Sequence, residues 1–400
     1  MKIYFITSKL NFKSSGGSVE EFDLMIRTLK SLGNEVVCIT TFVDQNDIPT
    51  PLPYEMIEEN IPCHGLLQLQ GGVYRIMRKY EHDADLFHVD GHLFLYGAGL
   101  YRRRGGKVPV SAFFNRELIS FPEDRSALIS AEQTSPMRRV KRLLRRILES
   151  TIGMYLARAI DLRAFISPMY QTMYERFGLR NNGHHFVLGD PIDFPKMMGE
   201  NGITATSYKE RLKTTGTLTL FYSSRMVAGK GFDLLLAGFA RVKNKEKYKL
   251  VLGGSGPEEE KIHNLAKELN IEQYVKFPGW LTRAQLYEHY KKADIFIQVG
   301  WRPEGTSMSL LYAIAFGLPS IVPSESGMAW QAQKSALTVQ NGDHEALARA
   351  IERLGEDPKL REELSHNCFV RINETQLDHK KIIACWFNEM KKITDQSQRS

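Results

Sequence analysis

Two cations and one carboxylate stand at positions where they could bind a phosphorylated ligand. Arg225 and Lys230 lie five residues apart in SSRMVAGKG, directly after a predicted strand, and two glycines flank the lysine. Two cations on a strand-end loop suit a diphosphate, because they neutralise the charge that develops on a leaving phosphate. Solvated surface cations remain the alternative for this loop alone, since exposed Lys and Arg are common.

The carboxylate is Glu304, which precedes a long apolar run in WRPEGTSMSLLYAIAFGLPSIVP. The run predicts a helix from about Thr306, with the backbone N–H groups of Gly305, Thr306 and Ser307 free to bind an anion. Glu304 would accept hydrogen bonds from the hydroxyl groups of the same ligand. A favourable interaction with the helix dipole explains Glu304 taken alone. With two cations at a neighbouring strand end, we favour ligand binding.

A third strand-end segment, LGGSGPEEE, does not match the dinucleotide fingerprint, because no further glycine completes G-x-G-x-x-G. Pro257 is typical of a first helical residue. We therefore predict a tight strand-to-helix turn here rather than a nucleotide-binding loop.

The elements that must position these residues alternate between strands and helices in both halves of the chain. A predicted strand at 3–7, an amphipathic helix at 20–33 and an apolar strand at 35–42 begin the first half. Continuous apolar strands between helices indicate parallel sheets that are buried on both faces. The polar stretch 190–216 predicts a linker with some local structure. We expect two Rossmann-like doubly wound domains facing a central cleft, with ligands at the carboxyl ends of the strands.

Composition excludes several classes of protein. The 400 residues carry a net charge of +7, spread as 24 basic and 21 acidic residues in 1–190 and 29 and 25 in 191–400, so neither domain looks like a nucleic-acid binder. The four cysteines are scattered, which disfavours a disulfide framework or a zinc site and suits a cytoplasmic location. The first apolar segment is too short for a signal peptide.

The motifs taken together resemble the retaining glycosyltransferases of the GT-B fold, specifically family 4. The resemblance rests on Arg225 and Lys230, on GGSGPE and on PEGTSMSLLYAIAFGLPSIV, and it extends to SSGGSVEEFDLMIRTLKSLGNEV and FVLGDPID in the first half. It implies an acceptor-side domain at 1–190, a nucleotide-sugar donor domain at 191–375, and a C-terminal helix at 376–400 that crosses back to the first domain.

The resemblance also implies roles for individual residues. Arg225 and Lys230 would bind the diphosphate with the backbone of Gly16 and Gly17, and Glu304 would bind the donor sugar. Donor-site neighbours would be the base-binding backbone from Phe277 through Gly279 to Trp280, together with Gly305, Thr306 and Ser307. Such enzymes keep the anomeric configuration and generally need no metal or other cofactor.

Two positions depart from the family pattern. The family usually has a second glutamate eight residues after the first, where this chain has Tyr312, and often a histidine where it has Asn115. A phenol cannot receive two hydroxyl groups as a carboxylate does. These differences bear on nucleotide identity and turnover rather than on the fold.

Several acidic and histidine residues of the first half have spacings that could form sites. Asp83 and Asp85 form a D-x-D pattern, which we interpret as a structural turn. His88, Asp90 and His92 alternate along a strand end, but no fourth zinc ligand has good spacing. Asp90 or His92 would contribute to acceptor binding, and core or surface histidines are the alternative.

The segment PMRRVKRLLRRILES predicts a basic amphipathic helix. It carries six cations between Arg138 and Arg146, and Met137 with five further apolar residues up to Leu148 forms one face. This pattern suits an anionic membrane surface, and it equally suits a helix that packs its apolar face on the core.

These observations and the family resemblance together predict a cytoplasmic retaining glycosyltransferase. Residues 137–148 would hold it at the inner face of the plasma membrane. It would move a hexose-type sugar from a nucleotide diphosphate to a glycan or lipid-linked acceptor in bacterial surface polysaccharide or glycolipid synthesis. A degenerate nucleotide-sugar binding protein and a sugar-nucleotide 2-epimerase are the alternatives.

Overall fold

The computed structural model describes residues 1–13, 17–48, 51–62, 65–116, 136–204, 216–301 and 304–399, without the side chains of 17, 18, 136–139, 141, 142 and 399. The described residues form two compact units. The first unit ends at Ile192 and takes up the chain again from Thr375, and the second unit is Asp193–Glu374.

The first unit is built on a seven-stranded parallel sheet in the order β3-β2-β1-β4-β5-β6-β7. Its strands are β1 (Lys2–Thr7), β2 (Glu35–Thr40), β3 (Glu55–Glu58), β4 (Leu86–Asp90), β5 (Val110–Phe114), β6 (Leu162–Phe165) and β7 (His185–Val187). Most of their side chains are buried. The sheet is therefore covered on both faces, as continuous apolar strands require.

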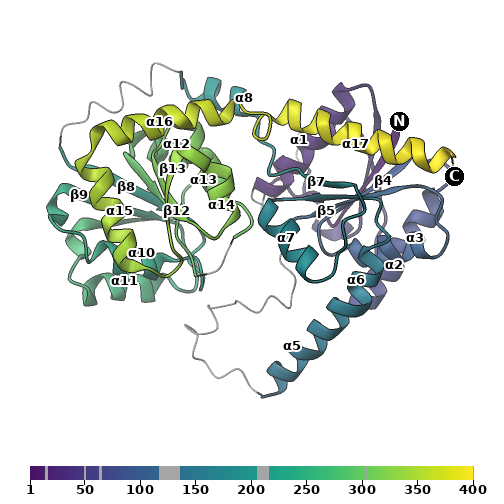
Figure 1. Ribbon diagram of the computed structural model, residues 1–400, viewed down its shortest axis with the longest axis horizontal. Helices are drawn as coiled ribbons and strands as arrows, with labels where there is room; N and C mark the ends of the chain where they lie inside the picture. The colour runs from purple at the N-terminus through teal and green to yellow at the C-terminus, as the bar shows by residue number, and fades with distance from the viewer. Residues whose placement is uncertain are drawn as a thin grey trace. The chain divides into compact units, whose positions relative to one another are not determined.

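Helices cover both faces of this sheet (Figure 1). One face carries α1 (Gly17–Ser31) and α17 (His379–Arg399), and the other carries α2 (Leu66–Tyr80), α3 (Leu95–Arg103), α6 (Met154–Ala157) and α7 (Pro168–Arg176). Trp386 of α17 is fully buried and packs edge-on against Phe5 and His88. The last helix of the chain thus belongs to the core of the first unit.

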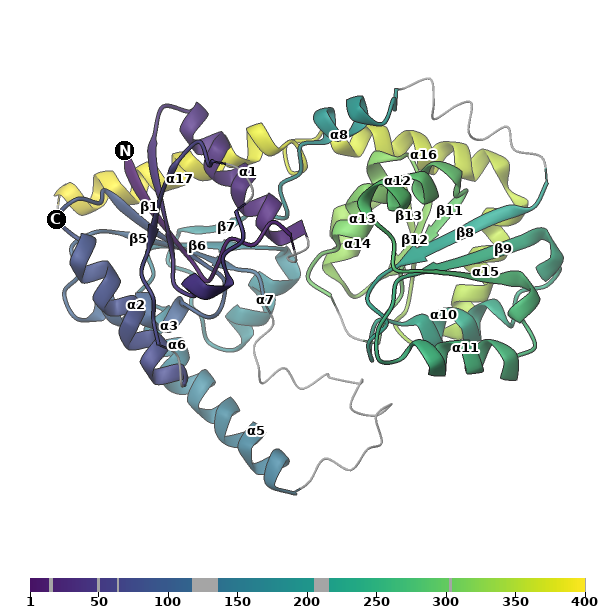
Figure 2. The same ribbon diagram turned by 180° about the vertical axis from the view of Figure 1, so that it is seen from behind.

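The second unit repeats the design with a six-stranded parallel sheet in the order β10-β9-β8-β11-β12-β13 (Figure 2). Its strands are β8 (Leu218–Ser223), β9 (Tyr248–Gly253), β10 (Val275–Gly279), β11 (Ile295–Ile297), β12 (Ser320–Pro323) and β13 (Ala336–Val339). One face carries α10 (Phe232–Phe239), α11 (Glu259–Glu268) and α15 (His344–Glu356), and the other carries α12 (Arg283–Lys292), α13 (Met308–Ala315) and α14 (Gly327–Ala332). The unit also contains α8 (Phe194–Glu200) and α16 (Pro358–Ile372).

The prediction of two doubly wound parallel-sheet domains is confirmed. Several elements had not been predicted, among them β3, α2, α3, α6, α7, α14 and α16. Of these, β3 is a short, half-exposed edge strand with little apolar signal. The predicted linker contains α8. Pro257 is not the first helical residue, because α11 begins at Glu259 and Pro257 lies in the turn before it.

The basic helix α5 (Pro136–Leu148) corrects one of the two interpretations of its apolar face. Its apolar side chains from Val140 to Leu148 are each at least half exposed. The expectation that this face packs on the core is therefore wrong for the described side chains. The side chain of Met137 lies outside those that the structure describes.

Gly231, which caps α10, has a positive φ of 76°, and a Cβ atom there would lie 2.1 Å from Val299 O. We expect Gly231→Ala to lower the free energy of unfolding of the second unit by about 2–4 kcal/mol, because both the backbone and the neighbouring strand end must shift. Urea unfolding followed by tryptophan fluorescence measures the change.

Gly199→Ala is the matched control, since nothing lies within 4 Å of its Cβ position in α8. It should leave the stability within about 1 kcal/mol of the wild type. Equal unfolding midpoints for the wild type and Gly231→Ala would contradict the steric argument.

Candidate functional site

Three of the predicted donor residues lie in loops at the point where the strand order of the second sheet reverses. In the order β9-β8-β11-β12, the strand that follows β8 in the chain lies on one side of it, and β11 lies on the other side. The strands after β11 continue away from β8, so the strand order reverses between β8 and β11. Ligands of open α/β sheets bind in the crevice at such a switch point, outside the carboxyl ends of the strands. The loop after β8 carries Arg225 and Lys230, and the loop after β11 carries Glu304.

Glycines allow the strand-end loops to touch through their backbones. A Cβ atom on Gly254 would lie 1.8 Å from Ser224 O, and one on Gly256 would lie 2.4 Å from Met226 O. The N–H of Met226 donates to Ser255 O at 2.9 Å. The glycines of GGSGP therefore pack one loop against the loop of Arg225, which agrees with the prediction of a tight turn.

Lys230 and Glu304 meet in an ion pair, with Lys230 Nζ 2.6 Å from Glu304 Oε1. Their side chains are 29% and 21% exposed, so the pair is partly buried yet reachable from solvent. A cation and a carboxylate held together at the strand-end edge of a sheet can bind a ligand that carries both phosphate oxygens and hydroxyl groups.

A chain of polar groups supports Glu304, and sequence analysis did not find one of its members, Gln298. Gln298 Nε2 lies 3.5 Å from Glu304 Oε2, while Gln298 Oε1 accepts from Ser307 Oγ at 2.5 Å. The backbone carbonyl of Glu304 accepts from the N–H of Gly327 at 2.8 Å. The signal in the sequence was a glutamine inside the apolar strand DIFIQVG.

The start of α13 differs from the prediction at one amide. Ser307 is the N-cap, and its Oγ accepts from the N–H of Leu310. The Ser307 N–H donates to the buried Gln331 Oε1 at 2.7 Å, so the expectation that this amide is free is wrong. Gly305 is buried and Thr306 is half-buried in the same loop.

Other predicted donor residues take different positions in the second unit. Arg225 is exposed. Phe277 stacks on His263 with ring centroids 4.0 Å apart, and Gly279, at φ 76°, accepts through its carbonyl from the N–H of Gly254. Tyr312 is half-buried and packs edge-on against the rings of Tyr287 and Tyr290. Trp280 is 67% exposed beside this strand end. Their donor-binding roles stay predictions.

The first unit has its own switch point between β1 and β4, and polar residues gather there. Thr7 Oγ1 donates to Asp90 Oδ2 at 3.1 Å, and Asn115 Nδ2 lies 3.4 Å from Asp90 Oδ1. Among the described residues, no donor reaches the buried Asn115 Oδ1 or Glu21 Oε1. Gly17 begins α1 beside this edge, and Gly16 lies outside the described residues.

Burial perturbs the carboxyl groups of this edge. It raises the pKa of Asp90 to about 6, although the hydrogen bond from Thr7 and the charge of Arg116 pull in the other direction. Burial raises the pKa of Glu21 well above its usual value, and the charges of Asp190 and Asp90 add to the effect. Perturbed carboxyl groups at a strand-end crevice are typical of a functional site.

His92 is buried, and both of its ring nitrogens have partners inside the first unit. Nδ1 lies 3.0 Å from Tyr174 Oη and Nε2 lies 3.0 Å from Glu149 Oε1. The acceptor role of His92 stays a prediction. His88 is a core residue that lies 3.1 Å from Ser111 Oγ.

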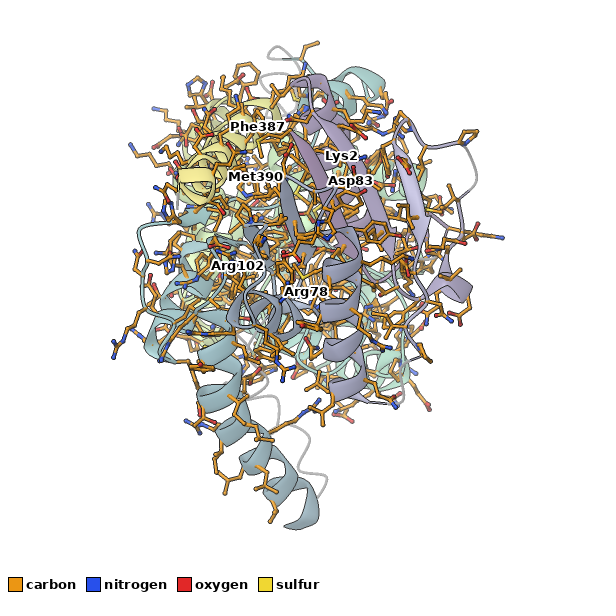
Figure 3. The ribbon with its side chains drawn as sticks, turned by 90° about the vertical axis from the view of Figure 1, so that its right-hand side faces the viewer. Lys2, Arg78, Asp83, Arg102, Phe387 and Met390 are labelled. Carbon is orange, nitrogen blue, oxygen red and sulfur yellow. The ribbon has the colours of Figure 1, made fainter. Side chains whose placement is uncertain are left out.

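Asp83 and Asp85 are structural, as predicted for the D-x-D pattern. Asp83 pairs with Lys2 Nζ at 2.7 Å, and Asp85 accepts from the N–H of Lys2 at 2.7 Å. Figure 3 shows Lys2 and Asp83 together at the start of β1. Across the described ranges, no three His, Cys, Asp or Glu residues are grouped to hold a metal ion. Within the same ranges, no helix has the length and apolar character to span a bilayer.

The second unit is similar in sequence to known proteins. Residues 205–369 match the family model for glycosyl transferases group 1. A lipopolysaccharide core biosynthesis glycosyltransferase, LpsD of Rhizobium meliloti, is 38% identical over 144 residues, which are 35% of this chain and 40% of that protein. The chain matches about two fifths of the length of its curated relatives.

Solved structures show a similarity of fold that covers both units. Sucrose-phosphate synthase of Thermosynechococcus elongatus superposes with a TM-score of 0.73 at 18% identity, covering 99% of each chain. Anabaena HepE in complex with UDP superposes with a TM-score of 0.70 at 16% identity, covering 98% of this chain and 100% of that one.

The chain has the GT-B fold of these structures, and its residues 205–369 are similar in sequence to the glycosyl transferases group 1. Its second unit carries the group 1 sequence match and the Lys230–Glu304 pair. Its first unit shares the fold of these proteins. The acceptor-side role of Asp90 and the donor-side role of Asn115 stay predictions from the sequence.

The raised pKa of Asp90 predicts a pH-dependent stability. An unfolded aspartate ionises near pH 3.9, so the folded state favours the protonated form, and the free energy of unfolding falls as pH rises from about 4 to about 6. We expect Asp90→Asn to stabilise the protein by about 1–2 kcal/mol at pH 7.5 and not at pH 4. Urea unfolding at both pH values tests this.

Asp44→Asn is the control, because Asp44 is exposed in the same unit. The free energy of unfolding of this variant should depend on pH as that of the wild type does. A stabilisation by Asp90→Asn that is equal at both pH values would show that the ionised carboxylate is not the cause.

Proposed function

We propose that this GT-B protein transfers a hexose-type sugar from a nucleotide-diphosphate sugar to an acceptor hydroxyl group, with retention of the anomeric configuration and without a metal ion. The acceptor is a growing glycan or a glycolipid of the bacterial surface. The protein acts in the cytoplasm.

The observation that carries this proposal is the ion pair of Lys230 with Glu304 at the switch point of the second sheet. A nucleotide-diphosphate sugar carries phosphate oxygens, which a cation binds, and sugar hydroxyl groups, which a carboxylate binds. Lys230 and Glu304 offer this cation and this carboxylate side by side. Lys230 and Arg225 then bind the diphosphate, while Glu304 binds hydroxyl groups of the sugar. The Gln298–Ser307 hydrogen bond keeps Glu304 in place.

In the proposed reaction, the bond from the anomeric carbon to the phosphate oxygen breaks, and a bond from that carbon to the acceptor oxygen forms on the same face. The proton of the acceptor hydroxyl group passes to the leaving phosphate oxygen. Lys230 stabilises the negative charge that develops on the diphosphate. No side chain of this protein is required as the general base.

The nature of the relatives supports the substrate class. LpsD acts in lipopolysaccharide core biosynthesis, and HepE was solved in complex with UDP. Other relatives are a GDP-mannose-dependent mannosyltransferase and a monoglucosyldiacylglycerol synthase. Because these proteins differ in base and sugar, UDP-glucose, UDP-galactose and GDP-mannose are all needed as probes.

Glu304→Gln should remove the preference of the protein for the nucleotide sugar over its bare nucleotide diphosphate, because a neutral amide accepts hydroxyl groups less strongly than a carboxylate. We expect about 10- to 100-fold weaker binding of the preferred nucleotide sugar and little change for the nucleotide. Calorimetry measures both, and NMR of the anomeric proton follows transfer and its stereochemistry.

Glu325→Gln is the matched control, since Glu325 is an exposed carboxylate of the same unit. Equal binding of every nucleotide sugar by the wild type and Glu304→Gln would refute the role of Glu304. Binding without turnover would identify a degenerate binding protein, and epimerisation of the donor without an acceptor would identify a 2-epimerase.

A further inference from the structure

Helix α5 and the turn after it expose a continuous apolar surface on the first unit. Seven large apolar side chains are each 50–57% exposed. They are Val140, Leu143, Leu144, Ile147, Leu148, Ile152 and Tyr155. The first five follow the spacing of one helical face. Exposed apolar patches of this kind mark interaction surfaces rather than ordinary protein surface.

The solvent-facing charges of the segment 136–155 are all positive among the described side chains. Residues 136–155 contain six cations and a single acid, Glu149. Glu149 lies in the π-helical turn η2 (Glu149–Gly153) and is buried. It accepts from Tyr96 Oη at 3.0 Å and faces His92 Nε2 at 3.0 Å. The only carboxylate of the segment is thus turned into the core, while Arg145 and Arg146 are exposed.

The cationic surface continues onto the end of α3. The guanidinium of Arg103 lies 4.1 Å from the ring centroid of Tyr155, and Arg103 Nη2 donates to Tyr155 O at 3.0 Å. Arg103 and Arg104 are both exposed. Figure 3 shows Arg102, the neighbour of Arg103, above the base of α5 and α5 extending away from the sheet.

The base of α5 is fixed to the first unit. The Tyr174 hydroxyl group, which bonds His92, also donates to Arg116 O at 3.0 Å, so Glu149, His92 and Tyr174 form one buried chain. Met154 is fully buried just after the turn. The exposed apolar face is therefore presented by an anchored helix.

We propose that α5 lies on an anionic lipid bilayer, with its apolar side chains among the acyl chains and its arginines at the lipid phosphates. Charge complementarity selects this occupant. An anionic surface attracts every exposed cation of α5 and of the α3 end, and the apolar face supplies the insertion. A second copy of the same helix would instead bring cations against cations.

Sedimentation of the full chain with phospholipid vesicles tests the proposal. Binding should be at least about tenfold stronger to phosphatidylcholine vesicles that contain roughly one third phosphatidylglycerol than to pure phosphatidylcholine, because cations add to the apolar insertion. High salt should weaken it. Two variants separate the contributions, Leu143→Ser/Leu144→Ser/Ile147→Ser for insertion and Arg145→Glu/Arg146→Glu for charge, and each should reduce binding about tenfold or more.

Matched controls are available in the second unit. Val370→Ser replaces an exposed apolar side chain of α16, and Lys249→Glu/Lys359→Glu reverses two exposed cations. Both should bind vesicles as the wild type does. Since every altered side chain is exposed, the thermal unfolding midpoint of each variant should stay near that of the wild type.

Three outcomes would overturn the proposal. The wild type fails to sediment with either vesicle, the α5 variants bind as well as the controls, or the wild type is a dimer in solution that the leucine variant dissociates. The last outcome would assign the face to a second copy of the chain. Nucleotide-sugar binding is measured without vesicles, so failure here leaves the proposed transferase activity to its own test.

Discussion

The loops after β8 and β11 approach each other so closely that residue 231 has no space for a Cβ atom beside Val299 O. This backbone contact sets the distance between the residue before Gly231 and the loop of Glu304. Lys230 therefore reaches Glu304 at 2.6 Å, and Tyr222 Oη donates to the carbonyl of Lys230 at 2.9 Å from within the core. The geometry of the Lys230–Glu304 pair therefore depends on a glycine that is not itself a member of the pair.

The two units place different chemistry at equivalent positions. Each sheet reverses its strand order beside its first strand, and polar residues gather at that point in both. In the second unit the carboxylate has a cation beside it. In the first unit Asp90 and Glu21 lack such a direct partner among the described residues, and burial raises the pKa of each. Such carboxyl groups lower stability, which is typical of residues kept for binding rather than for folding.

The segment that leads into α6 shows how one residue decides the character of a surface. Glu149 follows a run of cations and would balance part of their charge if it faced solvent. The π-helical turn instead directs it to Tyr96 and His92. Among the described side chains of residues 136–155, none that faces solvent is acidic, while the buried carboxylate anchors the helix.

The sequence by itself determined the fold class and the pairing of the loops that carry Lys230 and Glu304. Apolar periodicity and glycine positions identify parallel strands, and the carboxyl ends of parallel strands share one edge, so residues just after them must be neighbours. The family resemblance supplied their expected roles.

Only the tertiary structure decided which partners these residues take. Ser307 gives its amide to Gln331, 24 residues away, because α14 folds back beside α13, and no local pattern contains that contact. The same holds for α5. Its periodicity shows that one face is apolar, but a helix has the same pattern whether that face meets the core or lies open, and only the placement of its neighbours leaves it exposed.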